Sequence, residues 1–157
     1  MLVRHADAGD RSSYDRPDHL RPLSHKGELQ AEKIAERLVG IAPSHIVSSH
    51  AIRCIATVEP LARRLALEIE ELEALVEGSD PKSALSELLD RQSVHGGVLV
   101  ACSHGDVIPG IVELLVDAGV VHDRVSKIKK GSTVELTLEN DQVVNMKFLP
   151  PPLTGGS

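Results

Sequence analysis

Aromatic side chains are almost absent from this sequence of 157 residues. It has one tyrosine (Tyr14), one phenylalanine (Phe148) and no tryptophan. The hydrophobic core must therefore be built from Leu, Val, Ile and Ala. Stacking of nucleic-acid bases on aromatic rings is effectively excluded as a way of binding.

The sequence also has few cysteines, no excess of positive charge and no long apolar run. Cys54 and Cys102 lie far apart in apolar contexts, which predicts two buried reduced thiols and no disulfide framework. The formal net charge of −6 disfavours a nucleic acid as partner. No apolar run approaches the ~20 residues of a membrane span, and no signal peptide is visible. These features predict a cytoplasmic protein that does not enter a membrane.

Short apolar runs alternate with helical patterns along the chain. The patterns predict helices at 24–39, 51–66, 81–92 and 106–118, and strands at 1–5, 45–49, 67–72, 98–102, 133–138 and 143–148, the last two as a hairpin. Pro60 is expected to kink or divide the second helix. The alternation predicts an α/β fold: a three-layer α/β/α sandwich with a mixed, mostly parallel central sheet.

The length fits one domain with a single core, which we place at residues 1–149. Residues 150–157 contain three prolines and two glycines and are predicted to form a flexible tail. The first strand is shorter than the usual ~5–6 residues. The sequence therefore leaves open whether a further segment of chain precedes residue 1. The oligomeric state has no signature in the sequence.

Two histidines follow apolar runs at predicted strand ends. His5 follows Leu2-Val3-Arg4, and His104 follows the apolar run 98–102, the strongest strand prediction in the chain. Ligands bind at the carboxyl ends of strands in open α/β sheets. Two imidazoles beside a guanidinium therefore indicate a site for an anion, most simply a phosphate.

Each of these residues suits phosphate chemistry. A neutral imidazole at His5 can attack phosphorus, and nearby guanidinium groups keep it neutral. Arg4 can clamp phosphoryl oxygens, and Arg53 lies at the start of a predicted helix, where free amides also favour anions. Gly105 allows a phosphate to approach the backbone. The long polar loop 6–24 directly follows His5 and is expected to line or cover the site.

Four motifs together resemble the histidine phosphatase superfamily, the phosphoglycerate mutase-like group. They span nearly the whole chain in the family's order: Leu2-Val3-Arg4-His5; Arg21-Pro22-Leu23-Ser24 with Gly27 and Gln30-Ala31; Ser48-Ser49 with Arg53 and Thr57; and Ser103-His104-Gly105. The short length is similar to the SixA branch of phosphohistidine phosphatases. The segment 130–133 (Lys-Gly-Ser-Thr) also resembles the phosphatase-like domain that follows a Nudix domain in mycobacterial MutT-type proteins, although these 157 residues contain no Nudix segment.

The resemblance implies a metal-independent phosphohydrolase without a cofactor. His5 would become phosphohistidine, while Arg4, Arg53 and His104 would hold the phosphoryl group, with help from the Gly105 amide. The substrate would be a phosphorylated small molecule or a phosphohistidine protein.

A general acid should protonate the leaving group and then activate water. Glu77 stands where the family often places this acid, with Glu73 and Asp106 as rivals. Arg21 either reaches the phosphate pocket or braces the loop, and the sequence leaves both open.

Three other functions compete with this one. The main alternative is a regulatory domain that recognises a phosphorylated ligand with little turnover. A metal site built from some of the eight histidines is a second, but no paired-histidine helix motif or cysteine cluster supports it. Mutase activity is the third, and the short chain leaves little room for elements that close over a transferred phosphate.

Overall fold

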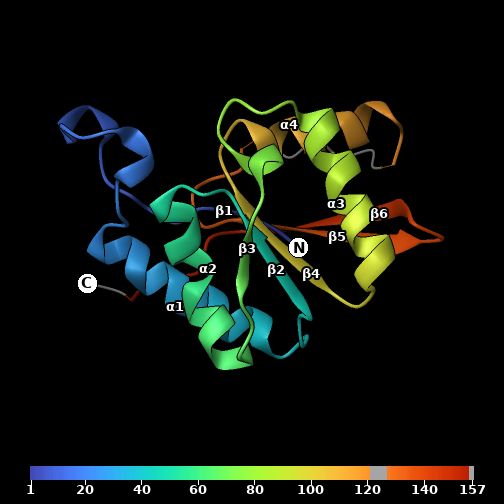
Figure 1. The fold of residues 1–157 in the computed structure, drawn as a ribbon, viewed down its shortest axis with the longest axis horizontal. Helices are drawn as coiled ribbons and strands as arrows, with labels where there is room; N and C mark the ends of the chain where they lie inside the picture. Colours follow the sequence, from blue (N-terminus) through green and yellow to red (C-terminus); the bar gives the residue numbers. More distant parts are fainter. Residues whose placement is uncertain (121–126, 156–157) are drawn as a thin grey trace.

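The computed structural model describes residues 1–120 and 127–155. Within these residues, the chain forms one sheet and the helices around it (Figure 1). The strands are β1 (Leu2–Arg4), β2 (His45–Ser48), β3 (Ile69–Glu71), β4 (Leu99–Ser103), β5 (Thr133–Glu139) and β6 (Gln142–Leu149). The α-helices are α1 (His25–Val39), α2 (Ile52–Leu65), α3 (Pro81–His95) and α4 (Val107–Asp117), and short 3-10 helices cover Arg11–Ser13, Asp18–Leu20 and Glu73–Leu75.

The sheet has the strand order β3-β2-β4-β1-β5-β6. The pairs β3·β2, β2·β4 and β4·β1 are parallel, whereas β1·β5 and β5·β6 are antiparallel. The predicted mixed, mostly parallel sheet is therefore confirmed, with the hairpin at one edge. β4 lies between two parallel neighbours, as its unbroken apolar run predicts.

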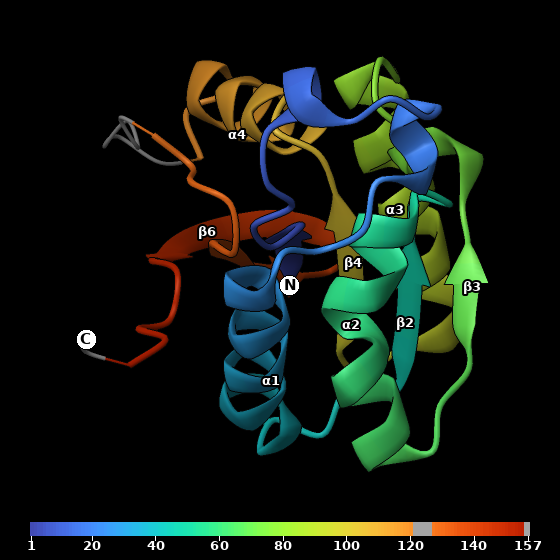
Figure 2. The same cartoon turned by 90° about the vertical axis from the view of Figure 1, so that its left-hand side faces the viewer.

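Alternate residues of the central strands enter two separate cores. Val3 packs in the core under α1 and α2, whereas its neighbour Leu2 packs in the core under α3 and α4. In β4, Val100 and Cys102 face the first core and Ala101 the second. Because side chains alternate across a strand, each face of the sheet has its own helical layer. Figure 2 shows α1 and α2 side by side over one face. The three-layer α/β/α prediction is confirmed.

A side-chain cap and a glycine determine how α1 begins. The side chain of Ser24 accepts a hydrogen bond from the amide of Gly27 at 3.1 Å and caps the helix. A Cβ on Gly27 would collide with the carbonyl oxygen of Asp7, so only glycine lets this helix approach the chain after β1 so closely.

Two details of the sequence prediction need refinement. Of the two expected effects of Pro60, a kink or a division of the second helix, division is wrong, because α2 runs continuously from Ile52 to Leu65 with Pro60 inside it. The loop 6–24 is also not wholly irregular, since it contains two single-turn 3-10 helices. Cys54 and Cys102 are both buried and free, as predicted.

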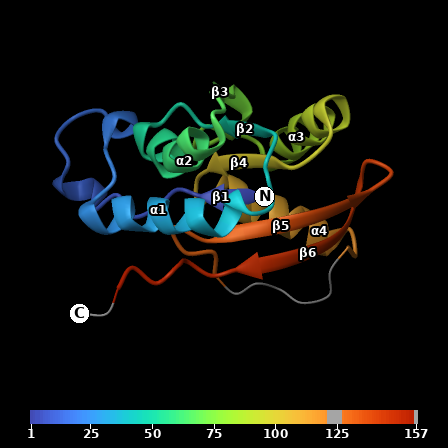
Figure 3. The same cartoon turned by 90° about the horizontal axis from the view of Figure 1, so that it is seen from below.

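After β6 the chain runs along the side of α1 (Figure 3). The guanidinium of Arg37 donates a hydrogen bond to the carbonyl oxygen of Pro150 at 2.8 Å. Residues 156–157 of the predicted tail lie outside the described residues. No helix in the described ranges is long and apolar enough to cross a membrane.

Candidate active site

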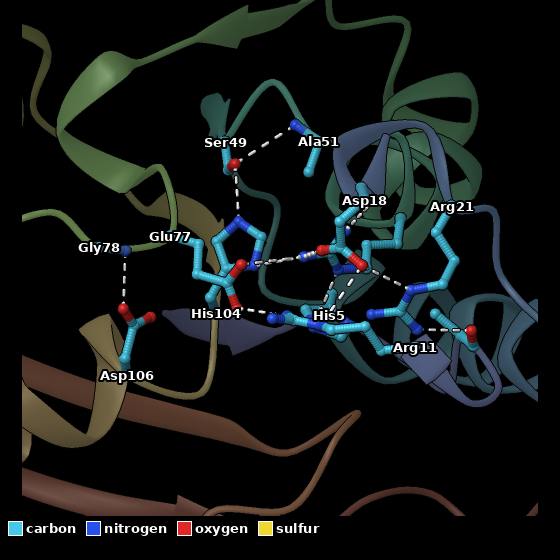
Figure 4. A network of polar contacts seen from close by, with 12 residues as sticks. His5, Arg11, Asp18, Arg21, Ser49, Ala51, Glu77, Gly78, His104 and Asp106 are labelled. Carbon is cyan, nitrogen blue, oxygen red and sulfur yellow. Dashed lines mark hydrogen bonds and ion pairs between the residues drawn. The ribbon is translucent and has the colours of Figure 1, made fainter. Parts of the chain in front are cut away.

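The three parallel strands β1, β2 and β4 end at the same edge of the sheet. His5 follows β1, Ser49 follows β2 and His104 follows β4, so the parallel topology brings them together. The His5 and His104 rings lie 5.5 Å apart between centroids, at an interplanar angle of 67°. Figure 4 shows both rings at the centre of a network of polar contacts. The two histidines that the sequence singled out therefore share one site.

His5 is buried, and one of its ring nitrogens is fixed as a donor. Nδ1 lies 2.8 Å from the carbonyl oxygen of Ala6, which can only accept a hydrogen bond, so Nδ1 carries the proton. Nε2 keeps its lone pair, which accepts a hydrogen bond from Nε of Arg53 at 3.4 Å. Burial, followed by the charges of Arg53, His104 and Arg4, lowers the pKa of His5 to about 3, although the bond to Ala6 opposes this shift. His5 is thus a neutral imidazole whose Nε2 carries no proton.

His104 is also buried and is held at both ring nitrogens. Nε2 lies 2.8 Å from Oγ of Ser49, and Nδ1 lies 3.4 Å from Nη2 of Arg53. Ser49 Oγ in turn accepts a hydrogen bond from the amide of Ala51 at 3.3 Å. With Nε2 anchored on Ser49, Nδ1 faces the space that Arg53 shares with His5. Because the Arg53 guanidinium can only donate, Nδ1 accepts this contact and Nε2 carries the proton towards Ser49.

Arg53 joins the two histidines to the loop 6–24. It is 1% exposed, and its Nη2 lies 2.9 Å from Oδ2 of Asp18 while its Nη1 donates to the Asp18 carbonyl oxygen at 2.8 Å. Burial alone would raise the pKa of Asp18, but the hydrogen bond from Arg21 and the charges of Arg53 and Arg11 lower it. Asp18 is therefore an ionised carboxylate that neutralises part of the cationic site.

Arg4 lies flat against the backbone at Gly105. A Cβ on Gly105 would lie 2.6 Å from both Cζ and Nη2 of Arg4, so a side chain at this position would displace the guanidinium. Arg4 Nη1 donates to the carbonyl oxygen of Ile128 at 2.6 Å, while its buried Nε has no hydrogen-bond partner within the described residues. The unpaired donor of a fixed guanidinium is available to an incoming anion.

Arg21 braces the loop. Its Nη1 donates to the carbonyl oxygens of Ala8 at 2.6 Å and Gly9 at 3.3 Å, and its Nε pairs with Oδ1 of Asp18 at 3.0 Å. Arg21 also lines the cavity above His5. The structure therefore assigns most of its donors to the loop, while its side chain still borders the space where a phosphate would lie.

The three rival carboxylates have different surroundings. Glu77 lies over the site, 2.6 Å from Nη2 of Arg11 and 3.7 Å from Nη2 of Arg53. Asp106 caps α4, accepting from the amides of Val107 at 2.8 Å and Gly78 at 2.7 Å. Glu73 is exposed and lines neither of the two cavities at the site. Glu77 and Asp106 both line the cavity over His5, and Glu77 also lines the cavity that reaches Arg53 and His104.

Two adjoining cavities border these groups. One of about 450 Å³ lies over Arg4, His5, Arg21 and Gly105, and one of about 220 Å³ reaches Arg53 and His104. Glu77 lines both. An apolar pocket of about 280 Å³ lies elsewhere, lined by residues that include Met1, Leu85 and Leu99. This pocket is separate from the site, because none of the histidines, arginines and carboxylates described in this section lines it. No group of His, Cys, Asp and Glu in the described part of the chain could hold a metal ion.

The structure adds residues that the sequence analysis missed as parts of the site. They are Arg11, Asp18, Ser49 and Lys130. Ser49 and Lys130 stand inside motifs that carried the family resemblance, so their positions gave a signal. Arg11 and Asp18 gave none, because the loop 6–24 mixes charges of both signs and its path depends on tertiary contacts.

Comparisons with known proteins agree with this geometry. A curated 8-oxo-(d)GTP phosphatase of Mycolicibacterium smegmatis is 34% identical over 155 residues, which is 97% of this chain and 48% of that protein. The chain thus spans about half the length of this relative. A structure described as the phosphohistidine phosphatase SixA of Agrobacterium tumefaciens superposes with a TM-score of 0.64 at 25% identity, covering 77% of this chain and 78% of that one. The protein histidine phosphatase SixA complexed with tungstate superposes with a TM-score of 0.73 at 20% identity, covering 94% of this chain and 92% of that one, and supports the fold.

Residues 1–79 match the histidine phosphatase superfamily (branch 1). With its Arg-His strand end, its second histidine and its phosphoglycerate mutase-like fold, this chain belongs to that superfamily.

Proposed function

We propose that this protein is a metal-independent phosphohydrolase in which His5 carries the phosphoryl group as a phosphohistidine intermediate. The observation that carries the proposal is the state of His5: Nδ1 donates to the Ala6 carbonyl, which leaves Nε2 unprotonated beside Arg53. The catalytic domain would comprise residues 1–149, with 150–157 as a tail.

The first step would form one bond and break another. Nε2 of His5 attacks phosphorus, and the bond from phosphorus to the leaving-group atom breaks with its electron pair on that atom. Arg4 and Arg53 would hold the phosphoryl oxygens, with His104 donating to them once Nδ1 carries a proton, and the Gly105 amide assisting. Glu77, once protonated, would supply the proton that the leaving atom needs.

The second step would regenerate the enzyme. Glu77 as a carboxylate takes a proton from water, the water oxygen attacks the phosphohistidine, and the P–N bond breaks to give back neutral His5 and inorganic phosphate. In the structure Glu77 is paired with Arg11 and approaches Arg53, which suits the carboxylate form needed for this step. Leaving groups that depart with little proton help are therefore favoured in the first step.

The substrate is a phosphorylated small molecule or a phosphohistidine protein. The similarity to SixA supports a phosphohistidine, whose imidazole leaves readily. The curated relative is named for a nucleotide substrate, which supports a small phosphate ester or anhydride. We expect the leaving group to lie between Glu77 and Lys130, where the larger cavity opens.

A phosphate-recognition domain with little turnover is the second candidate. The observation that favours it is the pairing of Arg53 with Asp18 and Glu77, because these carboxylates occupy a guanidinium that the phosphoryl group needs. A phosphorylated ligand would then displace these carboxylates from Arg53 and would be bound there without being cleaved.

One experiment separates the two. Phosphate release from a phosphohistidine peptide and from p-nitrophenyl phosphate is measured with EDTA present, for the wild type and His5→Ala. The phosphatase predicts activity that survives EDTA, is lost in His5→Ala, and passes through an acid-labile phosphoenzyme in the wild type. An active His5→Ala enzyme would exclude the mechanism. Protection against thermal unfolding by phosphate without turnover would favour the recognition domain.

A further inference from the structure

A groove of about 770 Å³ adjoins the catalytic cavity and is lined with cationic side chains. They are Arg4, Lys26, Lys127, Lys129 and Lys130, and among the described residues that line the groove the only carboxylate is Asp7. The groove is therefore strongly positive in a chain whose formal net charge is −6. Charge of one sign concentrated in a concave surface attracts ligands of the opposite sign.

The four lysines of the groove have no ion-pair partner in the part of the chain that the structure describes. None of them forms an ion pair with any residue in the described ranges, whereas Arg11, Arg21 and Arg53 at the catalytic site all do. The carboxylate of Asp7 accepts a hydrogen bond from Ser24 at 2.5 Å, and this bond lowers its pKa, as do the charges of Lys130 and Lys26. Asp7 is therefore charged, but one carboxylate facing five cations leaves most of the positive charge of the groove available to a ligand.

The groove and the catalytic cavity share two residues. Arg4 and Lys130 line both, so one ligand can contact both spaces. The backbone holds Lys130 beside the nucleophile, because the amide of Gly131 donates to the carbonyl oxygens of Arg4 at 3.1 Å and His5 at 3.0 Å. A leaving group that departs from a phosphorus atom at His5 can therefore reach the lysines directly.

The shape of the groove favours a small molecule over a protein surface. Its volume lies within the roughly 300–1,000 Å³ of small-molecule pockets. The chain after β6, residues 150–155, lines it together with the lysines and contributes three prolines and Leu153. A groove that combines cations with an apolar segment suits a ligand with an anionic part and a less polar part.

We propose that the substrate carries a second phosphate on its leaving group, which binds in the lysine groove while the terminal phosphoryl group lies at His5. This inference rests on the proposed phosphatase function and names its substrate class, a diphosphate or longer phosphoanhydride. The terminal P–O bond breaks at the bridging oxygen, which departs as part of a phosphate. Such a leaving group needs little proton help, in agreement with the ionic contacts of Glu77.

The test compares substrates across a variant and a charge-matched control. The variant Lys26→Gln/Lys127→Gln/Lys129→Gln removes three groove cations and keeps Lys130. The control Lys33→Gln/Lys82→Gln/Lys147→Gln removes three exposed lysines that do not line the groove. kcat/KM is measured for ADP, inorganic tripolyphosphate and p-nitrophenyl phosphate. The substrates differ in the reactivity of their leaving groups. This difference cancels when each variant is compared with the wild type on the same substrate.

We expect the groove variant to lower the ratio of kcat/KM for ADP to that for p-nitrophenyl phosphate by at least about tenfold, as loss of charge-assisted contacts predicts. The control should keep the wild-type ratio. An equal loss on tripolyphosphate indicates that the phosphates alone are recognised, and a larger loss on ADP indicates that the nucleoside contributes. Both results support the proposal. Equal loss on p-nitrophenyl phosphate would overturn it, because the lysines would then attract any anion.

A binding measurement keeps this inference separate from the phosphatase function. Calorimetric titration of wild-type protein with methylene-bridged ADP, which is not hydrolysed at that bridge, is compared with titration with AMP. The proposal expects the diphosphate to bind at least about tenfold more tightly, and the groove variant to remove that difference. Equal binding of the two nucleotides would overturn the proposal. Tight diphosphate binding in a protein that hydrolyses none of the substrates would overturn the phosphatase function alone.

Discussion

Oδ2 of Asp18 lies 2.9 Å from Nη2 of Arg53 and forms an ion pair with its guanidinium. Arg53 in turn lies within 3.4 Å of both active-site histidines. A carboxylate of the loop 6–24 is therefore already paired with the guanidinium that a phosphoryl group would need. Phosphate binding must replace or share this contact, which makes Asp18 a determinant of how strongly the site attracts anions.

Asp18→Asn should destabilise the protein and tighten phosphate binding. Three arginines around Asp18 would lose their counter-charge, which we expect to reduce the free energy of unfolding by about 2 kcal/mol. Inorganic phosphate would replace the missing charge. Thermal unfolding with increasing phosphate should show a larger rise in Tm for the variant than for the wild type.

The matched control is Asp15→Asn, an exposed loop aspartate that forms no ion pair among the described residues. It should leave both the Tm and the effect of phosphate at wild-type values. A smaller phosphate-induced rise in Tm for Asp18→Asn than for the wild type would show that Asp18 assists phosphate binding instead of competing with it.

Glu77→Gln should affect chemistry, whereas Asp106→Asn should affect stability. We expect Glu77→Gln to lower kcat on an alkyl phosphate by about 100-fold, and on a phosphohistidine peptide by less, because imidazole leaves readily. Asp106→Asn keeps an oxygen that can cap α4 but loses the acceptor for the Gly78 amide, so it should lower the free energy of unfolding by about 1 kcal/mol. Steady-state kinetics and denaturant unfolding measure the two effects, with Glu73→Gln as the control. A larger kinetic defect in Asp106→Asn than in Glu77→Gln would reassign the acid.

Gly105→Ala should weaken phosphate binding by moving Arg4. The new methyl group would lie 2.6 Å from Cζ of Arg4, so the guanidinium must turn away from its place beside His5. We expect the inhibition constant of vanadate to rise about tenfold or more. Gly40→Ala is the control, since a Cβ there meets no atom within 4 Å and its φ of −67° is open to alanine. An unchanged vanadate constant in Gly105→Ala would remove Arg4 from the phosphate site.

The stability of the protein should fall with decreasing pH because of His5. Its pKa in the folded protein is about 3, below the usual value of 6.5, so the unfolded chain binds a proton first as the pH falls. The stabilisation is complete above about pH 6.5 and is lost as the pH falls towards 3. Between pH 7 and pH 4 the loss due to His5 is about 3 kcal/mol.

Denaturant unfolding of the wild type and His5→Asn at both pH values measures this contribution. The wild type should lose about 3 kcal/mol more than the variant between pH 7 and pH 4. His25→Asn, at an exposed position, should behave like the wild type. Equal losses in the wild type and His5→Asn would contradict a neutral, buried His5.

The sequence by itself determined the fold class and the principal site residues. Alternation of short apolar runs with helical patterns predicts the parallel sheet, because each strand buried on both faces needs helices on either side. Polar residues placed directly after β1 and β4 then predict a shared site, since parallel strands end at one edge. His5 and His104 follow from this reasoning without knowledge of any contact, and Arg53 follows from its place at the start of a predicted helix.

Only the tertiary structure decided how the charged residues of the site are paired. Asp18, Arg11 and Glu77 lie on separate segments, and their contacts depend on the path of the loop 6–24 over the sheet. Glu77 and Asp106 differ because Asp106 caps a helix by a hydrogen bond. Sequence spacing alone cannot distinguish a capping carboxylate from a catalytic one. The lysine groove likewise combines α1, the segment before β5 and the chain after β6, which meet only in the folded protein. Local patterns determine elements, but long-range packing determines which charges become neighbours.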